Sequence, residues 1–201
     1  MYITARDRKI LEYIRNNKSI TINQCAKLFY TKNKEAYDQA RKRLRTLYNN
    51  KYIRRYRKDL QSECIYYMNK KLSSHDLKLY DVYAELVVAG ATILEFERKY
   101  RVYLTKDKYR EIDGLLVFKL DGYIYFWIIE VDLTHFTTDK KIIDIYNSNH
   151  FQEKFKKYAP NIFPTVIILK EIENTITYIL NKQIEIINTS VQPNIYKLLE
   201  G

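Results

Sequence analysis

Apolar residues recur at helical spacing in the first third of this chain, and at strand spacing further on. Residues 33–49 have a single apolar stripe with basic residues on the other side, which predicts a helix from Asn33 to Asn49. Two shorter helices are predicted before it, with Thr4 and Thr21 at their N-caps. Two β-type runs follow, residues 51–59 and 63–69. The stripe consists of Ala36, Ala40, Leu44 and Leu47.

The clearest strand pattern lies in residues 110–132. Two apolar runs flank Asp121-Gly122, the dipeptide typical of a two-residue type I′ turn, so we expect a β-hairpin in which Leu120 pairs with Tyr123. This register places like charges opposite one another, which destabilises a hairpin unless a cation, a backbone donor or a proton relieves the repulsion. A solvated hairpin end is the alternative interpretation. The acids expected to crowd one end of one face are Glu111, Asp113, Glu130 and Asp132.

The remaining segments complete a mixed pattern. A helix is predicted over residues 75–90, a strand over 91–104, a helical region over 134–158 and a buried strand over 165–170, whereas residues 172–187 are ambiguous. This order predicts an α/β sandwich with a mixed sheet and one parallel crossover.

Charge divides the chain in the same way. Residues 1–72 contain 19 Lys and Arg against 6 Asp and Glu, a net charge of +13, whereas residues 73–201 contain 16 against 18, a net charge of −2. We therefore expect two domains, 1–72 and 73–201, of which the first suits a polyanion.

Cysteine content and hydropathy bear on the compartment. Cys25 and Cys64 lie in apolar settings without metal-ligand spacing, which predicts reduced thiols and a cytoplasmic location. The longest apolar run, residues 123–131, is too short to cross a bilayer, so no membrane association is expected.

Three short helices followed by a basic hairpin resemble a winged helix–turn–helix domain, and the phrase RLRTLYNNKYIRR is similar to the end of that family's recognition helix. Lys51 stands where many members have Gly. The resemblance implies a third helix in the DNA major groove and a hairpin against the phosphate backbone. A basic face used for protein contacts is the alternative. The implied DNA-binding residues are Tyr37, Gln39, Arg41, Lys42 and Arg45 on the helix, and Arg54, Arg55, Arg57 and Lys58 on the hairpin.

The second part has a resemblance of its own. Ile112-Asp113-Gly114 and Glu130-Val131-Asp132 resemble the core motif of the PD-(D/E)xK nuclease superfamily. The longer phrases IDGLLVFKLDG and FWIIEVDLTHFTTDKKIIDIY, behind a winged helix, resemble the replication-relaxation family of plasmids, phages and integrated elements. The overall expectation is an α+β protein: a winged helix–turn–helix, then a restriction-endonuclease-like domain with a mixed central sheet.

The nuclease resemblance implies that Asp113 and Glu130, joined by Asp132, hold Mg²⁺ or Mn²⁺. Asp132, however, occupies the position of the superfamily's lysine, and an acid cannot neutralise the charge that develops on a phosphodiester. Lys140 or Lys141 could reach back to replace that lysine. The pattern therefore favours a non-catalytic nuclease-like domain over a working enzyme.

Together these features predict a sequence-specific double-stranded DNA-binding accessory protein of a mobile element, acting at a plasmid or phage replication origin or a conjugative transfer origin. The second domain is expected to form a homodimer or to recruit a replication or relaxase enzyme. The alternatives are a metal-dependent DNA nickase or endonuclease, and a transcriptional repressor.

Overall fold

The computed structural model describes residues 2–31, 34–133 and 135–199 and divides into two compact units, Met1–Val88 and Ala89–Gly201. The division lies after the helix at 74–88, whereas the charge pattern suggested a boundary at residue 72. The helix belongs to the first unit because Gln24 Nε2 donates to Leu77 O at 3.1 Å and to Asp81 Oδ1 at 2.8 Å. The chain is thus an α+β protein, as expected.

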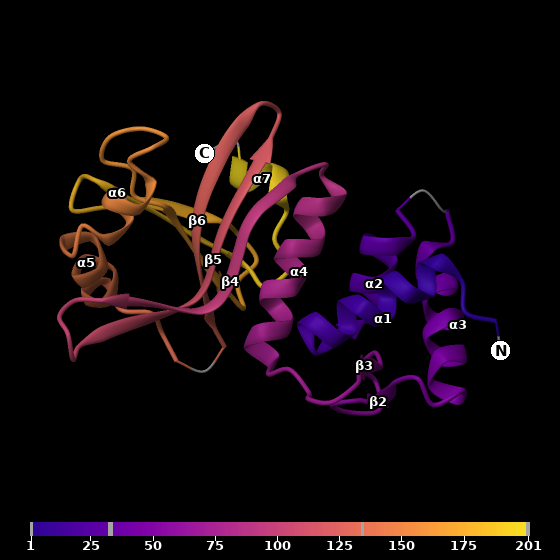
Figure 1. Cartoon of the computed structure of the whole chain (residues 1–201). Coiled ribbons are helices and arrows are strands. Elements are labelled where there is room, and N and C mark those ends of the chain that lie inside the picture. Colours follow the sequence, from indigo (N-terminus) through magenta and orange to yellow (C-terminus); the bar gives the residue numbers. More distant parts are fainter. Residues whose placement is uncertain (1, 32–33, 134, 200–201) are drawn as a thin grey trace. The chain divides into compact units, whose positions relative to one another are not determined.

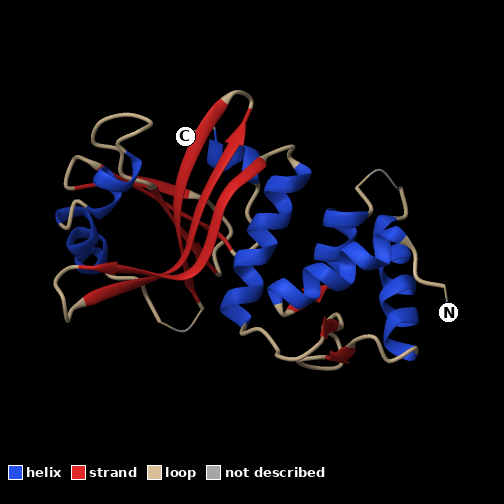
Figure 2. Ribbon diagram, in the orientation of Figure 1, coloured by secondary structure: helices blue, strands red, loops and turns tan. Residues whose placement is uncertain are grey.

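The first unit combines helices with a small antiparallel sheet (Figures 1 and 2). The sheet has three strands in the order β1-β3-β2. The strand β1 was not predicted; its three residues, all buried, pair with β3. The elements are α1 (Ala5–Asn17), β1 (Ser19–Thr21), α2 (Ile22–Phe29), α3 (Ala36–Asn49), β2 (Arg54–Tyr56), β3 (Ile65–Tyr67) and α4 (Ser74–Val88).

Helix starts in this unit follow the predicted caps. Thr4 and Thr21 each form a complete capping box, in which the cap hydroxyl accepts from the third helical N–H and the side chain at that position accepts from the cap N–H. The predicted start of the third helix, Asn33, lies outside the described residues. Within α3 the stripe is confirmed, since Ala40, Leu44 and Leu47 are fully buried.

The second unit is built on a six-stranded mixed sheet in the order β4-β5-β6-β7-β9-β8 (Figure 2). The strands β4, β5 and β6 form an antiparallel meander, β6 and β7 pair in parallel, and β8 forms the edge beyond β9. The elements are β4 (Thr92–Tyr103), β5 (Tyr109–Leu120), β6 (Tyr123–Asp132), α5 (Asp139–Asn147), α6 (His150–Phe155), β7 (Thr165–Lys170), β8 (Ile176–Leu180), β9 (Ile184–Ser190) and α7 (Ile195–Leu199).

Two sequence expectations differ from this topology. The ambiguous stretch 172–187 contains β8 and the start of β9, and β7 pairs with β9 in parallel, so the sheet has a second parallel pairing beyond the single crossover predicted. The helical region predicted over 134–158, whose first residue lies outside the described residues, divides into α5 and α6 at Asn149, which adopts a left-handed conformation (φ 55°).

The helices α5 and α6 pack apolar side chains against one face of the sheet. Ile142 and Ile145 of α5 and Phe151 and Phe155 of α6 are buried in one core cluster with sheet residues such as Ile128. In the part of the chain that the structure describes, no helix is long and apolar enough to cross a membrane.

Candidate functional site

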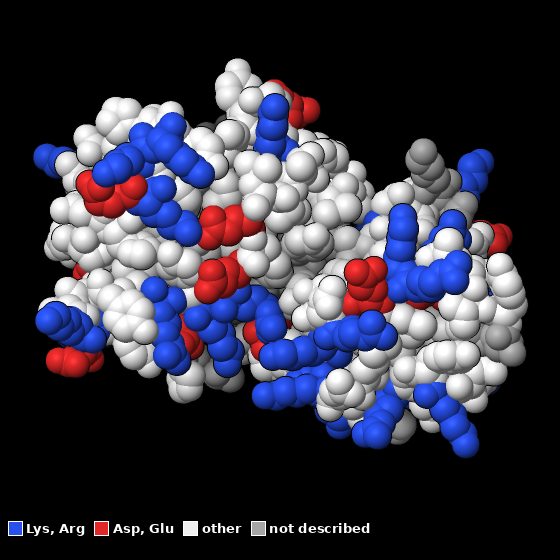
Figure 3. Space-filling view, viewed as in Figure 1, with Lys and Arg blue, Asp and Glu red and all other residues white. Residues whose placement is uncertain are grey.

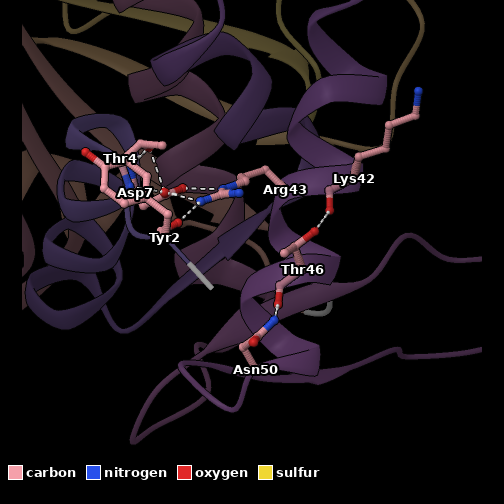
Figure 4. A network of polar contacts seen from close by, with 7 residues as sticks. All are labelled: Tyr2, Thr4, Asp7, Lys42, Arg43, Thr46 and Asn50. Carbon is pink, nitrogen blue, oxygen red and sulfur yellow. Dashed lines mark hydrogen bonds and ion pairs between the residues drawn. The ribbon is translucent and has the colours of Figure 1, made fainter.

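The helix α3 is fixed to its unit by a charged residue on its inner side. Arg43 Nε donates to Asp7 Oδ1 at 2.5 Å, and the guanidinium also forms an ion pair with Asp7 Oδ2 (Figure 4). Burial alone would raise the pKa of Asp7, but hydrogen bonds from Arg43 and Thr4 outweigh it, and the pKa is lowered. A carboxylate that is 1% exposed thus stays charged and orients α3.

The opposite side of α3 carries other cationic side chains. Lys42 extends away from the Asp7 network in Figure 4, while the backbone around it is tied by hydrogen bonds from Thr46 Oγ1 to Lys42 O and from Asn50 Nδ2 to Thr46 O. Lys and Arg side chains are spread over the first unit in Figure 3, with isolated Asp and Glu side chains between them.

Cationic side chains of α3 and of the β2–β3 hairpin line one pocket of about 300 Å³. Its described lining contains five cationic side chains and no carboxylate, which suits an anionic ligand with several phosphates. The lining residues are Ile22, Arg41, Lys42, Arg45, Arg55, Arg57, Cys64 and Tyr66.

Two of the hairpin arginines are oriented by neighbours that leave their charge unneutralised. The guanidinium carbon of Arg55 lies 4.3 Å from the ring centroid of Tyr48. Arg57 Nε lies 3.0 Å from Cys64 Sγ, and this thiol raises the pKa of Arg57 further. Neither role was identified from the sequence, because Tyr48 contacts Arg55 from α3 and Cys64 contacts Arg57 across the hairpin.

The predicted DNA-binding residues differ in exposure. Arg54 and Lys58 are exposed, and Tyr37 is 45% exposed. Gln39, expected to read a base, is half-buried, so it is less available than the arginines. Arg41 is exposed but lies 2.8 Å from Asp38 in a surface ion pair.

In the second unit the predicted hairpin register is confirmed up to Gly114 and Ile129, and the expected pairs of acids lie beyond the last paired residues. Leu120 pairs with Tyr123 and Gly114 with Ile129, and Asp121 and Gly122 both have positive φ, as a type I′ turn requires. At the next position of β5, the side chain of Asp113 contacts the backbone of β6: its Oδ2 accepts the N–H of Val131 at 2.8 Å.

Glu130 is the most deeply buried acid of this hairpin, with 2% exposed. Lys141 Nζ of α5 lies 2.6 Å from Glu130 Oε1, a close ion pair whose geometry falls short of an aligned hydrogen bond. Burial raises the pKa of Glu130 to about 7; Lys141 opposes this rise, while the charges of Asp113 and Asp132 add to it.

Two residues in this region differ from expectation. The lysine that reaches Glu130 is Lys141, whereas Lys140 is exposed. Glu111 does not join the cluster: it lies across the β4–β5 ladder from Arg101, whose Nε donates to it at 3.0 Å. The hairpin register was predicted correctly, but a pairing with β4 could not be inferred from the hairpin alone.

The acids do not form a metal-ligating group. Across the described ranges, no three His, Cys, Asp or Glu side chains are placed to hold a metal ion. Asp132 accepts from Thr137 N at 3.0 Å and from Thr137 Oγ1 at 2.7 Å, and Lys170 Nζ lies 3.9 Å away. Asp113 and Asp132 thus accept from protein donors, while Glu130 is paired with Lys141, and the three acids are not arranged as the Mg²⁺ or Mn²⁺ site that the resemblance implied.

Comparison with known proteins adds no constraint on the function. No protein-family model, curated protein or solved structure matches this chain.

Proposed function

We propose that this protein binds double-stranded DNA through α3 and the β2–β3 hairpin of its first unit. The observation that carries the proposal is the pocket between these elements, with five cationic side chains and no acid in its described lining. Cations on two different elements can contact phosphates on both sides of a groove, whereas a plain solvated surface needs no such convergence.

The arrangement of elements supports this proposal. The first unit contains a helix, a strand, two helices and a hairpin, with sheet order β1-β3-β2. This order resembles that of a winged helix–turn–helix. In that geometry α3 enters the major groove and the hairpin lies against the backbone. The anchoring of Arg43 to Asp7 turns Arg41, Lys42 and Arg45 outward.

The biological setting is proposed from the resemblance to the replication-relaxation family. We propose that the protein acts at a replication or transfer origin of a plasmid or phage, where it recruits a replication or relaxase enzyme. If the protein is instead a transcriptional repressor, the DNA site that it occupies is an operator. Selection of bound duplexes from a random pool distinguishes an operator from an origin.

The test is a fluorescence anisotropy titration of the full chain with duplex DNA. If five phosphates are contacted, affinity falls about 500-fold between about 50 and 200 mM salt, from a slope of about −0.9 per phosphate. Arg45→Ala should weaken binding and reduce the slope. Arg15→Ala on α1 removes the same charge outside the pocket and should leave binding nearly unchanged. Binding that is flat with salt, or equally weakened by both substitutions, would contradict the proposal.

A second candidate function, a metal-dependent endonuclease, is favoured by one observation. Lys141 places an amine beside Glu130, and this is the group that the motif lacked. The engaged carboxylates count against it. Nicking of a supercoiled plasmid with Mg²⁺ or Mn²⁺ decides the matter: an enzyme should lose activity in Lys141→Ala and keep it in Lys140→Ala. No nicking by the wild type leaves the second unit non-catalytic.

A further inference from the structure

The two edges of the six-stranded sheet differ in how they are protected. The edge strand β4 carries charges along its length, and its pairing with β5 shifts register between Ile93 and Glu95. Charges and bulges are the devices by which proteins prevent edge strands from pairing with other chains. The charged residues of β4 are Glu95, Glu97, Arg98, Lys99 and Arg101.

The other edge, β8, has none of these devices. Its sequence, ITYIL, contains no charge, proline or glycine. Ile176 is 57% exposed and Ile179 is 56% exposed, and these residues lie on opposite faces of the strand. β8 pairs with β9 on one side, and no described strand pairs with it on the other. This edge is therefore open to another strand.

We propose that β8 is a dimerisation edge, on which β8 of a second copy of this chain pairs in antiparallel orientation. A two-fold axis at the strand's midpoint, Tyr178, places Ile176 opposite Leu180 of the second copy and Thr177 opposite Ile179 of the second copy. These are pairs of β-branched and apolar residues, which stabilise antiparallel strands. The six-stranded sheets of the two copies would join into one.

The flanking charges favour a second copy in this orientation. Glu171 and Glu173 precede the strand, and Lys182 follows it. Antiparallel pairing about Tyr178 places Lys182 of one copy opposite Asn174 of the other, one residue from Glu173, at both ends of the contact. Parallel pairing would place like charges together, which is unfavourable. The edge is thus self-complementary, as a two-fold interface must be.

Protection of β4 limits the association to two copies. The second unit of each copy offers one open edge of its six-stranded sheet. Pairing of two copies uses both of these edges, so the assembly closes without growing into a fibre. The contact is short, and we expect a dimer that dissociates on dilution. The inference rests on the second unit alone and does not depend on DNA binding.

The experiment is sedimentation equilibrium of the full chain from micromolar to near-millimolar concentration. The wild type should pass from monomer to dimer. Ile179→Lys should weaken the dimer about tenfold or more, because it places a like-charged pair at the joined edges. The matched control, Leu94→Lys, places the same charge on β4 at a position 48% exposed and should dimerise as the wild type does.

Cysteine substitutions test the register. Tyr178→Cys should form an oxidised dimer, because residues directly opposite in an antiparallel pair lie within disulfide range, whereas Ile176→Cys should not. The native Cys25 and Cys64 are buried. If Ile179→Lys fails to fold, as circular dichroism would show, Thr177→Lys replaces it. A wild type that stays monomeric throughout, a dimer unaffected by the β8 lysine, or species that keep growing beyond the dimer would each overturn the proposal.

Discussion

The two units place charge in opposite ways. The first gathers cations at its surface, and one of its buried acids, Asp7, holds the helix that presents them. The second buries two acids, Glu130 and Asp132, which are 2% and 6% exposed, and brings Lys141 and Lys170 to them. A surface cluster of like charge needs a partner molecule to become favourable, whereas a buried acid needs a partner within its own fold.

The difference shows what each arrangement can do. Exposed cations are available to a polyanion at little desolvation cost, so the first unit is suited to recognition. In the second unit Asp132 accepts from Thr137 and Glu130 is paired with Lys141, so these acids contribute to internal structure and to the response to pH. The following predictions test this contrast, from the largest expected effect to the smallest.

Removal of Asp7, a buried acid of the first unit, should have the largest effect. Asp7→Ala leaves Arg43 without its partner and opens the capping box of α1, so we expect a loss of about 3 kcal/mol in the free energy of unfolding. Native-state hydrogen exchange of α1 and α3 amides measures it. Asp38→Ala removes an acid from an exposed ion pair and should cost about 0.5 kcal/mol or less. Equal losses would contradict the anchoring role of Asp7.

Glu130→Gln should flatten the pH dependence of stability in the second unit. Because burial raises the folded-state pKa of Glu130 from 4.5 to about 7, the folded state binds this proton more tightly than the unfolded state. The contribution of Glu130 to the free energy of unfolding is full below pH 4.5 and is lost as the pH rises through 7. The difference is about 3 kcal/mol. Urea unfolding at several pH values should show this loss in the wild type and not in the variant. A wild-type stability that rises across this window would contradict the assignment.

Substitutions in the pocket should separate two kinds of DNA contact. Arg41→Ala on α3 should cost about 1–3 kcal/mol on a selected site and reduce the preference for that site over random duplex. Arg55→Ala on the hairpin should weaken both duplexes alike, because it contacts phosphate. Anisotropy titrations with both duplexes measure this. If the two substitutions reduce the preference equally, α3 is not the element that reads the sequence.

Glu111→Ala should have the smallest effect. Its ion pair with Arg101 is exposed, with side chains 37% and 52% accessible, so we expect a change of about 0.5 kcal/mol or less in the free energy of unfolding. Urea unfolding measures it at pH 7. A loss comparable to that of Asp7→Ala would show that exposed and buried acids of this protein contribute equally to the free energy of unfolding. That result would contradict the contrast between the units.

Local signals predicted the local structure well. The N-caps at Thr4 and Thr21 and the hairpin register set by Asp121-Gly122 were all confirmed. Each of these depends on residues within a few positions of one another. The buried stripe of α3 was equally accessible, since helical periodicity determines which side faces the core.

Features that depend on distant segments could not be predicted in the same way. The choice between Lys140 and Lys141 depends on how α5 begins relative to β6, because a shift of one residue rotates a side chain by about 100° around a helix. The pairing of β7 with β9 depends on an excursion through β8 whose sequence fits several structures. The partner of Glu111 belongs to β4, outside the hairpin from which the acid cluster was inferred.

The strand order of the second unit has a consequence for how the chain reaches its folded state. The β4-β5-β6 half of the sheet joins neighbours along the chain through short turns, whereas β7 must return past α5 and α6 before it can pair with β6. Loop closure makes such non-local pairing slow. During synthesis the meander can therefore assemble while β7 is still being added, and its open β6 side stays exposed to other nascent chains until the crossover closes.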